Sequence, residues 1–190
     1  MFEVVVPATS ANLGCGFDSL GIALNIYNKF KFKKAEENIK INFKSKYQSL
    51  PIPPEENLIY KALEKLSAET GNKINGLEII EYSHIPLARG LGSSATAIWG
   101  GLLGGNHLLG EPLSQKELLE LALEMEDHPD NIVPALTGGL VINVSTEGKV
   151  KYKKINIENN LKAVLIIPDF ELKTAKLRKI LPDKIKMKDA

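Results

Sequence analysis

The chain has 190 residues, 44% hydrophobic, 25% charged and 6% aromatic, which fits one globular domain or one domain and part of another. Its formal net charge of +1 gives no electrostatic basis for nucleic acid or a membrane as the main partner. The N-terminus lacks the basic start and long apolar run of a signal peptide, and no window holds the ~20 apolar residues of a membrane span. Cys15 is the only cysteine, which excludes an intrachain disulfide, and together these features predict a cytoplasmic protein.

Strands dominate the first part of the chain. Apolar or alternating runs predict five β segments, the second and third forming a hairpin-like region: residues 2–6, 21–27, 30–33, 39–43 and 77–81. Residues 8–21 predict a polar, glycine-punctuated loop. An apolar stripe over residues 57–71, with Gly71 near its end, predicts an amphipathic helix.

Helices and strands alternate in the remainder. The capping-box pair Ser114 and Glu117 predicts a helix over residues 115–126, and Thr174 can cap a last short helix that Pro182 stops. The other predicted elements are an apolar helix, two strands and a charged, turn-rich stretch between those strands: residues 97–109, 138–144, 161–167 and 147–160. This interleaving predicts an α+β or α/β fold.

A domain boundary is predicted near residues 145–160. The strand and helix that follow are too short to form a domain, so they either complete the first domain or begin a second one. We favour the second alternative, with a first domain over residues 1–155 and the beginning of a truncated one over residues 156–190.

The segment PLARGLGSSATA (86–97) is the most informative part of the chain. Gly90 and Gly92 permit positive φ angles and let a polyanion approach the backbone closely. Ser93 and Ser94 follow at the apparent start of a helix, whose first turn offers free N–H donors and a partial positive charge. Such a turn can bind a di- or triphosphate, and a serine hydroxyl can bind Mg²⁺. The same glycines could instead form a tight turn that only begins a packed helix.

Taken whole, this segment resembles the nucleotide-binding signature of the GHMP kinase family, Pro-x-x-x-Gly-Leu-Gly-Ser-Ser-Ala. The resemblance implies that the loop wraps the phosphates of ATP and that Ser94 binds Mg²⁺. The implied cofactor-binding residues are Pro86, Leu87, Ala88, Arg89, Gly90, Leu91, Gly92, Ser93, Ser94, Ala95, Thr96 and, after the proline-rich loop, Asn57. The implied fold is that of GHMP kinases, with an N-terminal ribosomal-protein-S5-domain-2-like α/β domain and the start of a C-terminal ferredoxin-like domain.

Three further segments resemble the homoserine kinase branch of this family. In VPATSANLGCGFDSLG (6–21), Cys15 replaces a usual proline, and by position Asn12 and Asp18 would contact the amino acid substrate. An amide and a carboxylate suit its ammonium group. From the residues alone, Asn12 could equally form an Asx-turn and Asp18 could cap a helix.

EMEDHPDNIVPALTGGLV (124–141) is similar to the branch's Glu-Gly-His-Pro-Asp-Asn motif, with Asp127 in place of the glycine. The resemblance implies that Glu126 is a second Mg²⁺ ligand. Asn131 would be catalytic and substrate-binding, at the position where sister enzymes carry a catalytic aspartate, so no general base is obvious. His128 is interpreted as a loop histidine whose ring is satisfied by backbone groups.

A third segment, IPDFELKTAKLRKILP (167–182), places Thr174 and Arg178 on one helical face. The resemblance implies a substrate clamp in which the catalytic Arg178 holds the carboxylate, as a guanidinium fork can. The same two residues could also be a helix cap and a solvated arginine.

The resemblance covers essentially the whole chain and implies ATP- and Mg²⁺-dependent phosphorylation of the L-homoserine hydroxyl, giving O-phospho-L-homoserine for threonine synthesis. The family's second domain is missing after Ala190, so activity of this chain alone is not assured, and a homodimer, common in the family, is left open. Two other readings also stay open: a GHMP kinase for mevalonate or a sugar, and a non-catalytic nucleotide-binding module.

Overall fold

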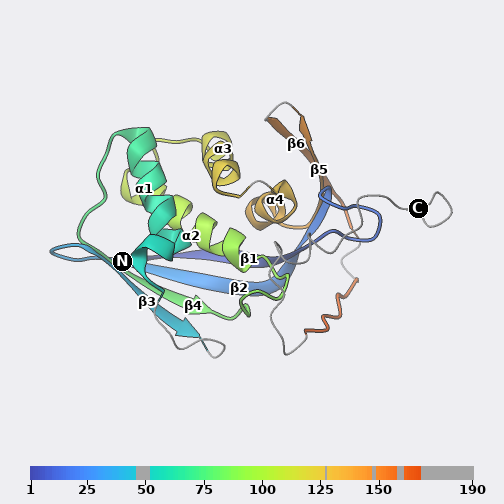
Figure 1. Cartoon of the computed structure of the whole chain (residues 1–190), viewed down its shortest axis with the longest axis horizontal. Helices are drawn as coiled ribbons and strands as arrows, with labels where there is room; N and C mark the ends of the chain where they lie inside the picture. The colour runs from blue at the N-terminus through green and yellow to red at the C-terminus, as the bar shows by residue number, and fades with distance from the viewer. Residues whose placement is uncertain (46–51, 127, 147–148, 158–160, 168–190) are drawn as a thin grey trace.

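The computed structural model describes residues 1–45, 52–126, 128–146, 149–157 and 161–167 (Figure 1). The helices and strands, in chain order, are β1 (Phe2–Ala11), β2 (Leu20–Lys34), β3 (Ile39–Ser45), the short 3₁₀ helix η1 (Pro54–Glu56), α1 (Leu58–Thr70), β4 (Leu77–Ser83), α2 (Ser93–Leu108), α3 (Gln115–Met125), α4 (Pro129–Thr137), β5 (Leu140–Thr146) and β6 (Lys149–Ile155). Figure 1 shows the helices gathered over one face of a single sheet, which confirms the predicted mixture of α and β structure.

Strand β2 organises the sheet, whose order is β3-β4-β2-β5-β6, with β1 also paired to β2. Phe30 of β2 has register partners in both β1 and β4, so these two strands lie on opposite edges of β2. On the β4 edge, residues 29–34 of β2 pair with β4 and residues 20–22 pair with β5. Residues 24–28 of β2 therefore lie between the two partner strands, where the chain leaves β4 for the glycine-rich segment.

The N-terminal strands are longer than the sequence pattern predicts. The predicted hairpin-like region is wrong, because β1 pairs with β2 from Gly21 to Phe32 and leaves no turn between the two β segments. Strand β1 also continues through Pro7 to Ala11. Its pairing with β2 resumes after Pro7 with a register shift between Pro7 and Thr9. Such a bulge interrupts the ladder where proline lacks an N–H donor.

Two predictions near the C-terminus are also wrong. Residues 149–155 form strand β6 instead of a turn-rich stretch, because they pair with the whole of β5, and the lysines of β6 suit a sheet edge. Residues 161–167 do not form the predicted strand and pair with no strand of the described residues. Val164 and Ile166 are 88% and 93% exposed, whereas Leu165 packs against a small apolar cluster around Leu91.

Helix α4 is absent from the sequence prediction because it is short and contains two prolines. Pro129 begins the helix, where its missing N–H costs nothing. Pro134 removes the bond that the Asp130 carbonyl would accept inside the helix. Tertiary contacts stabilise α4 instead: Ile132 is fully buried, and its carbonyl accepts a hydrogen bond from Trp99 Nε1 of α2 at 2.9 Å.

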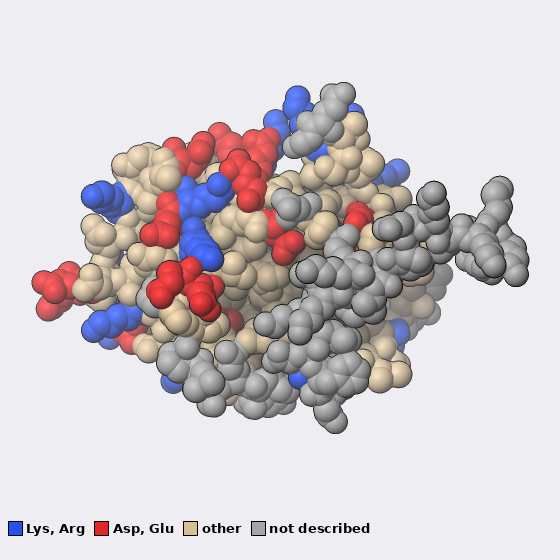
Figure 2. Space-filling view, viewed as in Figure 1, with Lys and Arg blue, Asp and Glu red and all other residues tan. Residues whose placement is uncertain are grey.

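The main core lies between the sheet and the helices, and the predicted helices α1 and α3 are confirmed. The side chain of Asn57 caps α1, and Ser114 and Glu117 form the predicted capping box of α3. Figure 2 shows acidic and basic side chains intermingled over the helical side of the molecule. There the ion pair between Lys65 Nζ and Glu124 Oε2, 2.6 Å long, joins α1 to α3.

Candidate nucleotide and substrate site

The glycine-rich segment leads directly into α2, as the sequence predicts. Gly90 and Gly92 have φ angles of +68° and +66°, and Gly92 occupies the N-cap position, where no side chain bonds the helix end. The first-turn N–H groups therefore have no side-chain cap, and Ser93 and Ser94 are the first two residues of the helix. This arrangement can bind an anionic phosphate group.

Gly92 also brings the segment into contact with β1 and α4. A Cβ atom at this position would collide with Thr9 Oγ1 and would lie 3.2 Å from Asn131 Oδ1. The two side chains touch each other as well, because Thr9 Oγ1 donates to Asn131 Oδ1 at 2.7 Å. The backbone N–H of Thr9 donates to the Leu91 carbonyl at 3.2 Å. The glycine-rich segment, Thr9 and Asn131 thus form one contiguous site.

A second group of polar side chains lies around the start of α4. His128 Nδ1 lies 4.0 Å from Asp18 Oδ1, a distance that allows an ion pair when the histidine is protonated. Asn12 Oδ1 accepts a hydrogen bond from the Asp18 N–H at 2.9 Å and closes the loop between β1 and β2. Both Asn12 and Asp18 adopt left-handed φ angles, 57° and 53°, which short polar residues tolerate.

These contacts decide some of the alternatives left by the sequence. No helix follows Asp18 in its loop, so the interpretation of Asp18 as a helix cap is wrong. Asn12 bonds a residue six positions on, in place of the two-residue Asx-turn. The interpretation of His128 as a loop histidine satisfied by backbone groups did not anticipate its carboxylate neighbour. His128 and Asn131 belong to the same turn of chain, so α4 links the Asp18 loop to the glycine-rich segment.

The predicted metal ligands come from the ends of two helices. Ser94 lies in the first turn of α2, and the half-buried Glu126 is the C-cap residue of α3. Across the described ranges, no group of three His, Cys, Asp or Glu side chains could hold a metal ion by itself. A hydroxyl and a carboxylate suit Mg²⁺ as two oxygen ligands in a shell completed by phosphate oxygens and water.

Three other predicted site residues have separate outcomes. Asn57 is 8% exposed, and its Oδ1 accepts the N–H groups of Ile59 and Tyr60 at 2.9 and 3.4 Å, which is a capping role. Its predicted nucleotide contact stays a prediction. Thr174 and Arg178 lie outside the described residues.

Two residues of the site region were missed by sequence reasoning. Thr9 is fully buried beside Asn131, and Asn28, also fully buried, bonds the backbone just before the glycine-rich segment. Both lie inside strands, where threonine or a single asparagine gives no pattern that separates function from structure. Only the pairing of β1 and β2 with distant segments identifies them.

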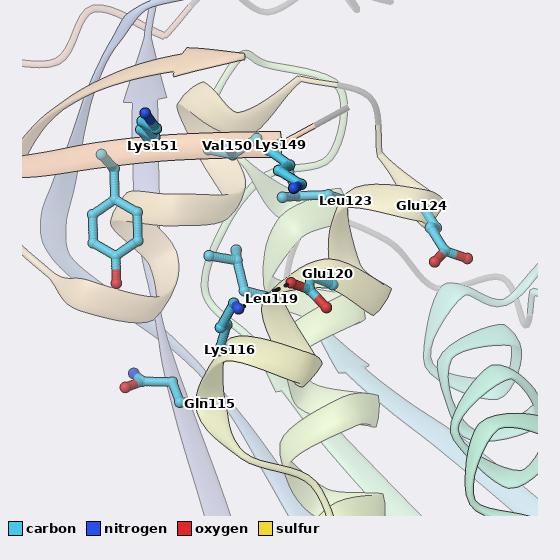
Figure 3. A pocket seen from close by; sticks show the side chains of 10 residues that line it. Gln115, Lys116, Leu119, Glu120, Leu123, Glu124, Lys149, Val150 and Lys151 are labelled. Carbon is cyan, nitrogen blue, oxygen red and sulfur yellow. Dashed lines mark ion pairs between the residues drawn. The ribbon is translucent and has the colours of Figure 1, made fainter. Parts of the chain in front are cut away.

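A cavity of about 990 Å³ lies elsewhere, between α3 and β6 (Figure 3). Leu119 and Leu123 line it from α3, and Lys149 and Lys151 line it from β6. It shares no lining residue with the glycine-rich segment or the Asp18 loop.

Among the described helices, none combines the length and apolar character needed to cross a bilayer.

Comparison with known proteins shows what the chain is similar to. Residues 57–139 match the GHMP kinases N terminal domain. The chain is 51% identical over 193 residues to the homoserine kinase of Halothermothrix orenii and 50% identical over 192 residues to that of Clostridium beijerinckii. Both alignments span 100% of this chain and 62% of the relative, so the chain covers about three fifths of these relatives.

Solved structures agree with this assignment. The crystal structure of homoserine kinase from Cytophaga hutchinsonii superposes with a TM-score of 0.83 and 33% identity, over 98% of this chain and 61% of that one. The mevalonate kinase of Methanococcus jannaschii, at 18% identity and a TM-score of 0.64 over 83% of this chain and 56% of that one, shares the fold. Residues 57–139 thus correspond to a GHMP kinases N terminal domain, and over its whole length the chain is similar to part of the homoserine kinases.

Proposed function

We propose that the whole protein transfers the γ-phosphoryl group of ATP to the side-chain hydroxyl of L-homoserine. The bond between the γ-phosphorus and its bridging oxygen breaks, a bond to the substrate oxygen forms, and ADP, O-phospho-L-homoserine and one proton are released. The observation that supports this most directly is the contact of Gly92 with the Thr9–Asn131 pair, beside the Asp18 loop. That contact joins a phosphate-binding helix end to a cluster of polar groups suited to an amino acid.

The glycine-rich segment would bind the phosphates of the nucleotide. The N–H groups of the first turn of α2 are oriented by the helix itself, so they need no reorganisation when the ligand binds. Ser94 and Glu126 would hold Mg²⁺, which when bound neutralises charge on the phosphates. Because phosphoryl transfer depends mainly on positioning and charge neutralisation, a site of this kind needs no strong base.

We assign the binding site for homoserine, the phosphoryl acceptor, to the region around Asn131, His128 and Asp18. Asn131 is neutral and hydrogen-bonded to a neutral threonine, so its amide can orient a hydroxyl but cannot remove its proton. The Asp18 carboxylate and the Asn12 amide would hold the substrate ammonium group. Thr174 and Arg178 would bind the substrate carboxylate, a role suited to a guanidinium.

The acceptor site can be tested separately from the nucleotide site. We expect Arg178→Ala in the longest natural form of the protein to raise KM for homoserine by roughly 100-fold, because a charge-assisted bidentate contact is lost. The Kd for Mg-ATP, measured by titration calorimetry, should change less than about twofold. Lys179→Ala, the neighbouring cation, is the matched control. An unchanged homoserine KM in Arg178→Ala would remove the proposed clamp.

A further inference from the structure

The side chain of Asn28 lies at the base of the glycine-rich segment, on the stretch of β2 between its contacts with β4 and β5. It is fully buried. Its carbonyl oxygen Oδ1 accepts two backbone hydrogen bonds, from the N–H groups of His84 at 2.9 Å and Ile85 at 3.2 Å. These residues immediately precede Pro86, so Asn28 holds the start of the segment.

The same amide also holds the end of the segment. Asn28 Nδ2 donates to Thr96 Oγ1 at 3.2 Å, and Thr96 lies in the first turn of α2, fully buried. The Thr96 hydroxyl in turn donates to the Ser93 carbonyl at 2.8 Å, which leaves its lone pairs to accept from Asn28. The Asn28 side chain therefore bonds His84 and Ile85 before residues 86–95 and Thr96 after them.

The orientation of this amide is determined by its partners. Two N–H groups require an oxygen at Oδ1, and the second hydrogen of Nδ2 points to Glu81 Oε1 at 3.3 Å. Both acceptor sites and both donor hydrogens of the amide are thus used, which is the full capacity of an asparagine side chain. Moving the two ends of the segment apart by more than a hydrogen bond tolerates would break at least one of these buried bonds, each costly to leave unmade.

From these contacts we infer that Asn28 is a positioning residue, which holds the two ends of the glycine-rich segment at the separation that nucleotide binding requires. This inference rests on the proposed function, since it names ATP as the ligand of the segment. Asn28 itself is fully buried, so it would act on the nucleotide through the segment. Glu81, 5% exposed on β4, supports it by accepting the second Nδ2 hydrogen.

The test compares Asn28→Leu with Asn106→Leu in the longest natural form of the protein. Asn106 is a matched control, because it is also buried and its amide also bonds backbone groups, the N–H and carbonyl of Leu113, away from the segment. Both variants should lose stability. We expect Asn28→Leu alone to raise the Kd for Mg-ATP by about tenfold or more, as several oriented bonds are lost. Asn106→Leu should bind Mg-ATP within about twofold of the wild-type protein.

A second readout is independent of nucleotide binding. Amide hydrogen exchange of His84 and Ile85, measured without ligand, should accelerate in Asn28→Leu and stay unchanged in Asn106→Leu. If Asn28→Leu fails to fold, Asn28→Ser, which keeps a shorter hydroxyl, takes its place and the same two readouts apply. Wild-type Mg-ATP affinity together with unchanged exchange would overturn the inference. Failure of the wild-type protein to bind Mg-ATP would overturn the proposed function and ATP as the ligand of the segment. Amide hydrogen exchange of His84 and Ile85 would still decide whether Asn28 holds the segment.

Discussion

Thr9 Oγ1 donates a hydrogen bond of 2.7 Å to Asn131 Oδ1 and joins β1 to α4 across 122 residues of sequence. The bond fixes the Asn131 amide, whose Nδ2 lies 3.5 Å from Asp130 Oδ1. Neither partner is a base near neutral pH. The pair thus holds the Asn131 amide, with its Oδ1 next to Gly92, at the position for which the sequence motif predicts a catalytic role.

Loss of the Thr9 hydroxyl should slow the reaction. We expect Thr9→Val to lower kcat roughly tenfold, because Asn131 loses the bond that orients it, while Thr9→Ser restores most of the activity. Thr137→Val is a control, since the Thr137 hydroxyl bonds the backbone carbonyls of Val133 and Gly138 at the far end of α4. Steady-state kinetics with saturating Mg-ATP measure the effect, and wild-type kcat in Thr9→Val would show that the bond is dispensable.

Gly92 should not tolerate a side chain. We expect Gly92→Ala to abolish measurable Mg-ATP binding and to reduce the free energy of unfolding, because its Cβ would collide with the buried Thr9 Oγ1. Gly71→Ala separates this collision from backbone strain: Gly71 also has a positive φ of 68°, but its Cβ would meet no atom within 4 Å. That control should cost only about 1 kcal/mol of stability. Equal stability losses in denaturant titrations of the two variants would argue against the close contact.

Asn57 tests whether a predicted cofactor residue is only a helix cap. Asn57→Ala should lower the free energy of unfolding by about 1 kcal/mol, and Asn57→Ser should retain most of it, since serine also caps helices. We expect the Kd for Mg-ATP to increase in both variants if the predicted nucleotide contact exists. If Mg-ATP affinity falls only in Asn57→Ala, together with the free energy of unfolding, then Asn57 acts only as a helix cap.

Glu81 should make stability depend on pH. Burial raises the pKa of Glu81 to about 7 from 4.5, so between these values the folded protein holds a proton that the unfolded chain has lost. The free energy of unfolding should therefore fall as pH rises from about 4.5 to about 7, by an amount on the order of 3 kcal/mol, and then level off. Glu81→Gln should lack this contribution. Denaturant titrations at pH 5, 6, 7 and 8 measure it, and parallel pH profiles for the two proteins would contradict the assignment.

The local parts of the fold could be predicted from the sequence. The helix over residues 57–71, the capping box at Ser114 and the glycine-rich segment depend on residues close together in the chain, which periodicity and capping rules describe. Pairing between distant strands does not follow from such rules. The single long β2, the lysine-rich β6 and residues 161–167, which pair with none of the described strands, all depend on which partner strand is present, and no local pattern shows this.

The candidate site also contains residues that sequence motifs predict and residues that only distant contacts identify. The glycine-rich segment, Asn131 and the Asp18 loop were predicted from motifs, and the structure brings these three into one region. Thr9 and Asn28 were not, because each acts through a contact with a residue more than 50 positions away. Helix α4, which carries Asn131, is stabilised mainly by packing against β1, β2, β5 and α2 and not by its own propensity.

The most direct measurement is ADP release by the longest natural form of the protein, with Mg-ATP and either L-homoserine or mevalonate. We predict turnover with homoserine and none with mevalonate, and a large loss of homoserine turnover in Asn131→Ala. A folded protein that binds Mg-ATP but releases no ADP with homoserine would contradict the proposed function and leave a nucleotide-binding protein that is similar to the GHMP kinases.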